Sequence, residues 1–161
     1  MIRLKMLVSL WLACWVLIFS PLTALAATQA TEESPFLFKH IPLRTLNQVT
    51  ADLIRAIDNN NYTFVRQQAI DARLVPVEVE ARSVYVLYFC NFAKMNRALA
   101  IDTRAAQFLP CRFTLFESDG GVSIVVINPA WVSLELRNPL LHPDCLALKR
   151  DYLAIMEEAA L

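Results

Sequence analysis

The sequence predicts an α+β domain with a mainly antiparallel sheet and helices packed on one face. Strand-like segments gather around a tight turn at Asp119-Gly120-Gly121, which is typical of a hairpin between antiparallel strands. Strands and helices do not alternate strictly, as a doubly wound parallel fold would require. The order along the chain is a strand, a helix, a run of strands interrupted by a helix, a hairpin and a closing helix.

The N-terminal segment predicts a secretory signal peptide over residues 1–26. A short positive start, Met1–Lys5, precedes the apolar run Met6–Phe19, and Ala24–Ala26 has the small-x-small pattern of a cleavage site. The apolar run is shorter than the roughly 20 residues that a membrane-spanning helix needs. We therefore expect export to the periplasm, with a tether over residues 27–35 and a single domain over residues 36–161. Membrane attachment would come only from an uncleaved signal.

Composition excludes several classes of function. The chain has 15 basic and 15 acidic residues, so it lacks the positive charge that is typical of nucleic-acid binding. Its two glycines, Gly120 and Gly121, are too few for a glycine-rich phosphate loop or a dinucleotide fingerprint. No Gly-x-Ser-x-Gly or His-Glu-x-x-His pattern nominates a hydrolase. We expect a binding domain rather than an enzyme.

The first elements of the domain are a strand and a helix. Residues 36–41 predict the strand, which Pro42 ends. Thr45 begins the helix, and Gln48 completes a capping-box pattern three residues later. Asn59-Asn60-Asn61 ends the helix, because asparagine tolerates left-handed backbone. Apolar side chains recur between these ends at helical spacing and predict one buried face: Leu46, Val49, Leu53 and Ile57.

Two strands and a second helix come next. Residues 62–70 and 84–89 predict the strands, and the later one is the strongest of the chain because β-branched and aromatic residues fill it. The segment between them, residues 72–82, is a connection or a weak strand. Asn91 is suited to cap a helix over residues 92–101.

The remaining chain predicts the hairpin and two helices. Strands over residues 112–116 and 122–127 flank the glycine turn. Asn128-Pro129 caps a short helix around Trp131. Pro143 suits the first turn of a last helix. The buried face of that helix is expected to contain Cys145, Leu148, Tyr152 and Ile155.

The segment from Tyr85 to Pro129 resembles the prokaryotic family called domain of unknown function 302. The resemblance rests on the order and spacing of four short motifs: Cys90-Asn91 at a strand end, Leu109-Pro110-Cys111, Gly120 in the hairpin, and Asn128-Pro129 where the family usually has Asp-Pro. It implies a TATA-binding-protein-like β-α-β-β-α-β-β-α fold, often a homodimer, and no established activity. The signal peptide and the added Cys145 depart from the family pattern.

Three cysteines follow the predicted signal: Cys90, Cys111 and Cys145. In an oxidising compartment thiols tend to form disulfides, and an odd number leaves at least one unpaired. A helix leads the chain away from Cys90 and a short segment returns it to Cys111, so the two sulfurs are able to meet. Three interpretations stay open: a Cys90–Cys111 disulfide, a thiol site for redox exchange, sulfur transfer or a soft metal, and buried thiols that act as small apolar side chains.

A reactive thiol needs positive charge or a helix N-terminus nearby to stabilise its thiolate. Arg104 and Arg112 flank Cys111 in the sequence, and Cys90 directly precedes the helix start at Asn91. These five residues are the candidate ligand-binding or redox site. One observation weakens the pattern: Arg112 follows Cys111 along a strand, and successive strand residues point to opposite faces.

His142 and Cys145 are candidate ligands for a soft metal such as copper or zinc, because imidazole and thiolate suit these ions. No Cys-x-x-Cys or His-x-x-x-His pair supplies further ligands. The alternative is a histidine at a helix entrance beside a core cysteine. We expect no cofactor other than such a metal.

The sequence thus predicts an exported domain that binds a small molecule or a protein partner, with Cys90 and Cys111 at or near the site and thiol chemistry as its mechanism. The alternative is a structural or interaction domain that forms a homodimer, in which the two cysteines form an inert disulfide. A weak thiol oxidoreductase is a third hypothesis.

Overall fold

The computed structural model describes residues 33–70 and 84–161. The predicted signal peptide, most of the tether and the connection over residues 72–82 lie outside the described residues. The elements in chain order are β1 (Phe36–Pro42), α2 (Leu46–Asn59), β2 (Thr63–Ala69), β3 (Val84–Cys90), α4 (Phe92–Ile101), the 3-10 helix η2 (Thr103–Phe108), β4 (Cys111–Ser118), β5 (Gly121–Ile127), α5 (Pro129–Glu135) and α6 (His142–Glu158). The predicted α+β order is confirmed.

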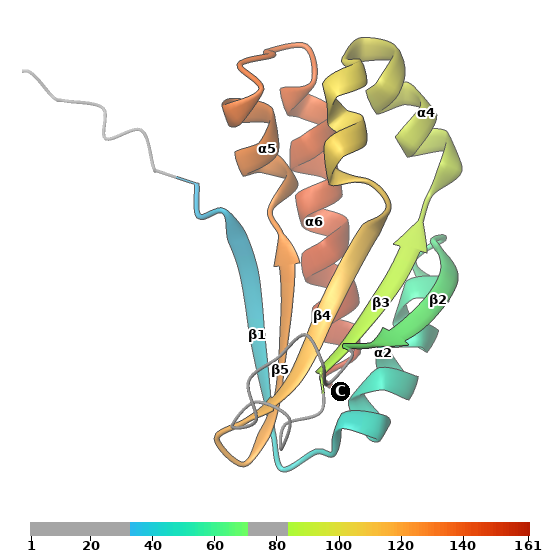
Figure 1. The fold of residues 1–161 in the computed structure, drawn as a ribbon, viewed down its shortest axis with the longest axis vertical. Coiled ribbons are helices and arrows are strands. Elements are labelled where there is room, and N and C mark those ends of the chain that lie inside the picture. Colours follow the sequence, from blue (N-terminus) through green and yellow to red (C-terminus); the bar gives the residue numbers. More distant parts are fainter. Residues whose placement is uncertain (1–32, 71–83) are drawn as a thin grey trace, which may run out of the picture. The chain divides into compact units, whose positions relative to one another are not determined.

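The five strands form one antiparallel sheet in the order β1-β5-β4-β3-β2 (Figure 1). The β4–β5 hairpin contributes two of the three inner strands, and its turn has Gly120 at a φ of 75°, where glycine is favoured. A Cβ on Gly121 would overlap the carbonyl oxygen of Ile41, because β1 passes directly against this end of β5. The two glycines therefore serve the turn and the close approach of β1.

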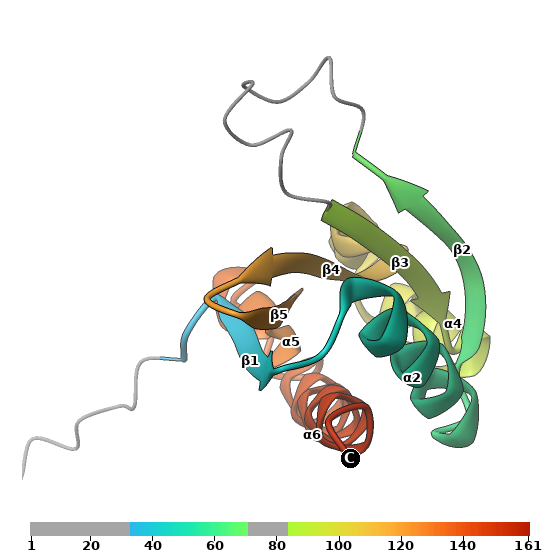
Figure 2. The same cartoon turned by 90° about the horizontal axis from the view of Figure 1, so that it is seen from below.

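Helices α2 and α6 lie side by side on one face of the sheet (Figure 2). Phe89 of β3 and Phe113 of β4 stack with ring centroids 4.5 Å apart. Tyr152 of α6 meets both rings edge-on, at 5.3 Å and 5.9 Å. The predicted buried face of α2 is confirmed, because Leu46, Val49, Leu53 and Ile57 all lie in this core.

The opposite face of the sheet has no helix over it among the described elements (Figure 2). Phe38 on β1 points to this side and is 59% exposed. The remaining helices, α4, η2 and α5, stand beyond one end of the sheet (Figure 1). No helix in the described ranges is both long and apolar enough to cross a membrane.

Local signals predicted most helix ends. The capping box is present at Thr45, whose hydroxyl accepts from the Gln48 amide while the Gln48 side chain accepts from the Thr45 amide. Asn61 has a φ of 62°, the left-handed conformation expected of this asparagine run. Two features were not predicted: β4 extends at both ends, to Cys111 and Ser118, and residues 103–108 form η2 rather than a connection.

Candidate functional site

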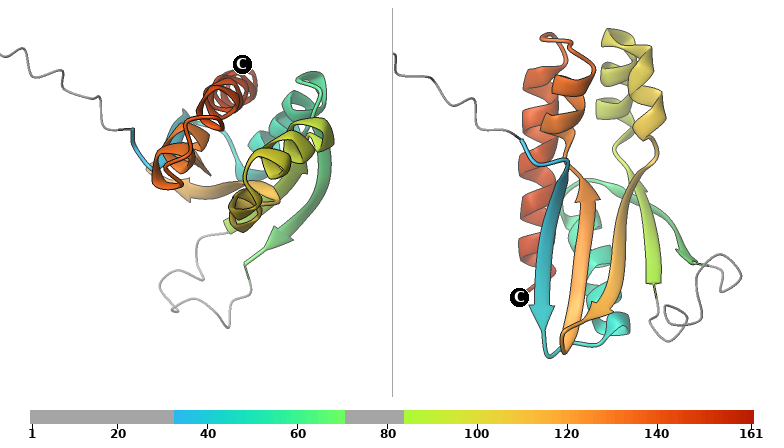
Figure 3. Two further views of the ribbon diagram at one scale, coloured as in Figure 1. Left: turned by 90° about the horizontal axis from the view of Figure 1, so that it is seen from above. Right: turned by 60° about the vertical axis from the view of Figure 1, so that its left-hand side comes forward.

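The inner strands β4 and β5 separate at the end of the sheet that adjoins α5 and η2. Their pairing stops at Thr114↔Val125. Beyond this point β4 still pairs with β3 as far as Cys111, and β5 still pairs with β1 as far as Ile127. The sheet is therefore split between two of its inner strands, and the strands visibly diverge towards the helices (Figures 1 and 3).

An apolar cavity of about 70 Å³ lies at this split. The ends of β4 and β5, helices α4 and η2, and helices α5 and α6 form its walls, with Ala98, Val126 and Val132 among the lining residues. An engineered cavity of about 150 Å³ is large enough for benzene, so this one has room for a few carbon atoms. Among the described residues that line it, four have side chains with polar atoms or sulfur: Cys111, Arg112, Cys145 and Tyr152.

Small side chains on the cavity walls, together with the turn of the chain from β5 into α5, create this space. Ala98 and Ala105 face the cavity from α4 and η2, where a larger side chain would fill it. Asn128 ends β5 and turns the chain into α5, because its Oδ1 accepts from the Ala130 amide at 3.0 Å. The Asn128 side chain also donates to the carbonyl oxygen of Ser34, 2.8 Å away, which ties the end of β5 to the start of the domain.

A polar cluster links η2 to the chain between α5 and α6. Asp102 accepts two hydrogen bonds from the Arg104 guanidinium, at 3.0 Å and 2.7 Å, and one from Asn138 at 3.0 Å. Arg104 also donates to the carbonyl oxygen of Leu136 at 2.8 Å. Arg104 and Asn138 hold the pKa of Asp102 well below its usual range, the arginine more strongly.

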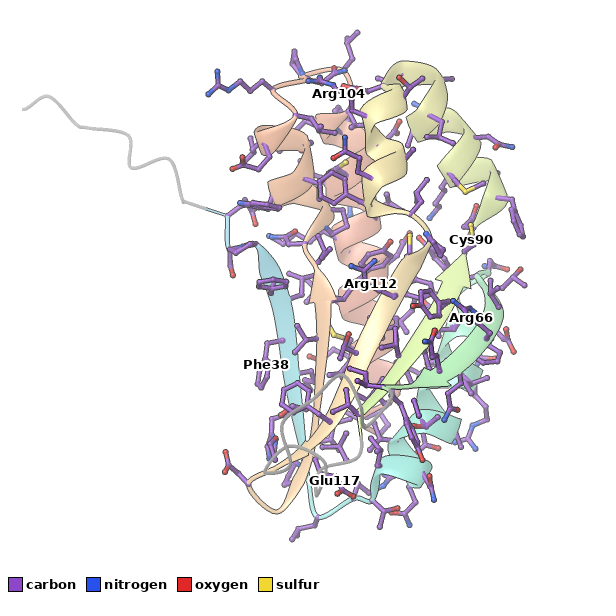
Figure 4. The ribbon with its side chains drawn as sticks, viewed as in Figure 1. Phe38, Arg66, Cys90, Arg104, Arg112 and Glu117 are labelled. Atoms are coloured by element: carbon purple, nitrogen blue, oxygen red, sulfur yellow. The ribbon has the colours of Figure 1, made fainter. Side chains whose placement is uncertain are left out.

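These contacts correct the predicted role of Arg104. Its guanidinium is bound to Asp102 and to the end of α5 rather than to a thiolate. Figure 4 shows Arg104 near the far end of the helices, apart from both Cys90 and Arg112. The candidate thiol site is therefore not assembled as the sequence pattern predicted.

Cys90, Cys111 and Cys145 are free thiols, so the structure does not contain the predicted Cys90–Cys111 disulfide. Cys111 lies opposite Phe89 in the sheet register. Cys90, the next residue along β3, lies opposite Thr63 of β2 in the register. Its sulfur instead lies 3.6 Å from the sulfur of Met95 in α4.

Burial raises the pKa of all three thiols. Removal from water is the largest cause at each one, and it brings the pKa of Cys145 to about 11. At Cys111 a hydrogen bond with Tyr152 opposes this rise, and the charge of Arg112 opposes it more weakly. The thiolate is the reactive form of cysteine, so these environments disfavour nucleophilic thiol chemistry at neutral pH.

The other predicted site residues have structural contacts. Asn91 caps α4, because its Oδ1 accepts from the Lys94 amide at 3.0 Å, and it donates to the carbonyl oxygen of Asn61 at 2.9 Å. Arg112 is exposed and lies opposite Tyr88 in the register, so it does point away from the face that Cys111 occupies. It nevertheless borders the cavity.

His142 and Cys145 are not joined by further metal ligands in the described part of the chain, where no group of three or more His, Cys, Asp or Glu side chains could hold a metal ion. Nδ1 of His142 lies 2.7 Å from the Ser133 hydroxyl oxygen. That hydroxyl donates to the carbonyl oxygen of Ala130, so Nδ1 of His142 is the donor in their pair. His142 thus supports the junction between α5 and α6.

Sequence reasoning named three of the cavity residues, Cys111, Arg112 and Cys145, for a different chemistry. It missed the cavity because the split between β4 and β5 leaves no local pattern. The available signal was the pair of small side chains, Ala98 and Ala105, in the segment between Cys90 and Cys111.

Comparisons with known proteins identify the same kind of domain. A family model described as "Domain of unknown function DUF302" matches residues 24–159. The crystal structure of an uncharacterized conserved protein DUF302 from Bacillus stearothermophilus is similar, with a TM-score of 0.70 and 14% sequence identity. The similarity covers 79% of this chain and 99% of that chain. No curated protein matches this chain.

Proposed function

Since the chain belongs to the DUF302 family, whose description gives no activity, we propose a function from its own cavity: the domain binds a small molecule whose apolar group enters the split between β4 and β5. The observation that carries this proposal is an apolar cavity at the one place where the pairing of β4 and β5 ends. Concave and mainly apolar sites with a few polar groups are typical of ligand binding.

The energetic cost of an empty cavity supports the proposal. Apolar atoms that line an unfilled space lack van der Waals partners on that side, and these lost contacts are a cost to the fold. An alanine-to-leucine change on one wall would remove much of that cost. A ligand that fills the space would recover the same lost contacts without any change of sequence.

The thiols have a passive part in this proposal. Cys111 and Cys145 line the cavity as neutral, polarisable groups, since burial raises the pKa of both. Neutral buried cysteines behave as small apolar side chains. Their environment therefore favours contact with an apolar ligand over redox exchange or sulfur transfer.

Filling the cavity tests the proposal. Ala98→Leu adds a branched side chain to the wall formed by α4, and we expect it to weaken the binding of pentan-1-ol at least about tenfold while it maintains or raises the melting temperature. Amide shifts in an NMR titration with pentan-1-ol would give the dissociation constant and the location of the bound alcohol.

The matched control is Ala100→Leu, the same substitution at an exposed position of α4, which should leave the titration unchanged. Val132→Ile, which adds one methylene from the α5 wall, provides a second filled variant if Ala98→Leu does not fold. Unchanged binding in a folded, filled variant would contradict a ligand site in this cavity.

Export to the periplasm and homodimer formation stay predictions. The family match begins at residue 24, close to the predicted cleavage point after Ala26, which supports treating the residues before it as an addition to the domain. Sequencing the N-terminus of the protein recovered from a periplasmic extract would test export. An N-terminus at Met1 would contradict it.

A further inference from the structure

We propose that the ligand of this cavity is a small carboxylate with a short apolar tail, whose headgroup binds Arg112 at the cavity mouth. This inference rests on the proposed function and adds the chemical class of the ligand. It is carried by three observations: the place of Arg112 on the cavity wall, the lack of an ion pair or hydrogen bond to it from the described residues, and the lack of another charged side chain among the described lining residues.

Arg112 is positioned where a headgroup would emerge from the cavity. It is the second residue of β4, within the stretch that no longer pairs with β5. It lines the cavity and is exposed, and an arginine in such a place can lay its methylene stem on apolar surface while its charged group stays in water. Figure 4 shows it at the upper part of the sheet, below the helices that close the cavity.

The guanidinium of Arg112 has no ion pair or hydrogen bond with the residues that the structure describes. Several other arginines are engaged: Arg97 pairs with Asp144 at 2.7 Å, and Arg104 pairs with Asp102. Arg66 on β2 lies opposite Tyr88 on β3, which in turn lies opposite Arg112 on β4. The Arg66 guanidinium stacks over the Tyr88 ring, with 4.4 Å between its carbon and the ring centroid. Within the described part of the chain, no side chain occupies the donors of Arg112, which leaves them open to a ligand.

The side chains that line the cavity favour a negatively charged ligand. Of the described residues that line the cavity, Arg112 is the one charged at neutral pH, because Cys111, Cys145 and Tyr152 are neutral there and the others are apolar. A planar guanidinium binds a carboxylate through two parallel hydrogen bonds, whereas it repels a cation. A neutral headgroup would gain neither the charge nor the paired geometry.

The volume of the cavity limits the length of the ligand's apolar tail. A space of about 70 Å³ admits a few carbon atoms. A longer chain would have to continue past the mouth, where water would surround it. The class of ligand is therefore a short aliphatic or branched acid.

Three probes with the same five-carbon chain and different headgroups test this inference: pentanoate, pentan-1-ol and pentylammonium. In NMR titrations we expect pentanoate to bind at least about tenfold more tightly than pentan-1-ol, and pentylammonium to bind more weakly than the alcohol. Added sodium chloride should weaken pentanoate binding and leave pentan-1-ol binding nearly unchanged, since salt screens the charge at an exposed guanidinium.

Two variants locate the headgroup. Arg112→Ala should reduce pentanoate affinity to that of pentan-1-ol without changing the affinity for the alcohol, and Arg112→Lys should give an intermediate value because it keeps the charge and loses the paired geometry. Arg55→Ala is the matched control. Arg55 lies on α2 beside Glu158, near the C-terminal end of α6, whereas the cavity lies at the N-terminal end of α6. It should leave all three titrations unchanged.

The outcomes separate the two proposals. The role of Arg112 is overturned if pentan-1-ol binds in the cavity and pentanoate binds no more tightly. It is also overturned if Arg112→Ala, with an unchanged melting temperature, still prefers pentanoate. In both cases the cavity remains a ligand site. If none of the three probes shifts the lining residues, the proposed function fails, and the assignment of the headgroup fails with it.

Discussion

At the scale of single residues, Asp102 has a structural role that depends on contacts with both neighbouring and distant residues. It caps η2 by accepting from the Arg104 amide at 3.0 Å, and it is bound by the Arg104 guanidinium and by Asn138. These donors favour the charged carboxylate, which lowers its pKa. The residue therefore stabilises the fold while it is ionised.

The pH dependence of stability tests this role. A carboxyl whose pKa is lowered by folding contributes stability above its unfolded value of about 3.9, and the contribution is lost as the pH falls below that value. Asp102→Asn should lower the melting temperature at pH 7, and the difference from the unmodified protein should shrink as the pH falls from about 4 towards 2.5. Calorimetry across this range would measure it.

The control for this experiment is Asp58→Asn, at an exposed carboxyl in the last turn of α2. It should change the melting temperature little at any pH. A difference between the protein and Asp102→Asn that stayed constant down to pH 2.5 would contradict a stabilising role for the ionised form.

At the scale of secondary-structure elements, α4 depends on a cap that also joins it to another segment. The Asn91 side chain accepts from the Lys94 amide and donates to the carbonyl oxygen of Asn61, next to the end of α2. The cap satisfies a backbone donor that has no partner within the helix. This explains Asn91 without assigning it to a ligand site.

Truncation of this cap gives a prediction of modest size. Asn91→Ala should lower the free energy of unfolding by about 1 kcal/mol, the usual cost of removing an asparagine cap. Asn47→Ala, an exposed asparagine on α2, should have a much smaller effect. Urea denaturation would measure both variants. A loss of pentan-1-ol binding in Asn91→Ala at unchanged stability would contradict the purely structural role.

At the scale of the whole domain, the core lies between the sheet and the pair of helices α2 and α6. Phe113 is fully buried against Phe89 and Tyr152, whereas Phe116, three residues later on β4, faces the other side and is half-buried. The two faces of one strand therefore contribute unequally to stability.

A pair of identical substitutions on β4 tests this asymmetry. Phe113→Ala should lower the free energy of unfolding by about 3–5 kcal/mol, because it removes a ring from the centre of the core and leaves a cavity. Phe116→Ala should lower it by clearly less. Equal losses in chemical denaturation would show that the open face of the sheet is covered as fully as the helix-covered face.

Most of the fold was predictable because its signals are local. The capping box at Thr45, the cap at Asn91 and the glycine turn each fix a helix end or a hairpin within a few residues. The η2 helix was missed, because its cap at Asp102 occurs in a segment with no helical run of apolar residues. The candidate site was predicted only in part, since Arg104 and Asn91 have structural partners that are distant in the sequence.

The amino-acid sequence by itself determined the order of elements, the antiparallel hairpin and the membership of a family whose motifs are short and regularly spaced. Hydrophobic periodicity, helix caps and turns involve only a few neighbouring residues, so they can be recognised in the sequence alone. The tertiary structure alone decided that β4 and β5 part after Thr114↔Val125, that a cavity forms there, and that Arg112 borders it without an ion-pair partner among the described residues. These features depend on how β1, α5, α6 and η2 pack around the sheet, and long-range packing of this kind leaves no pattern in a single segment.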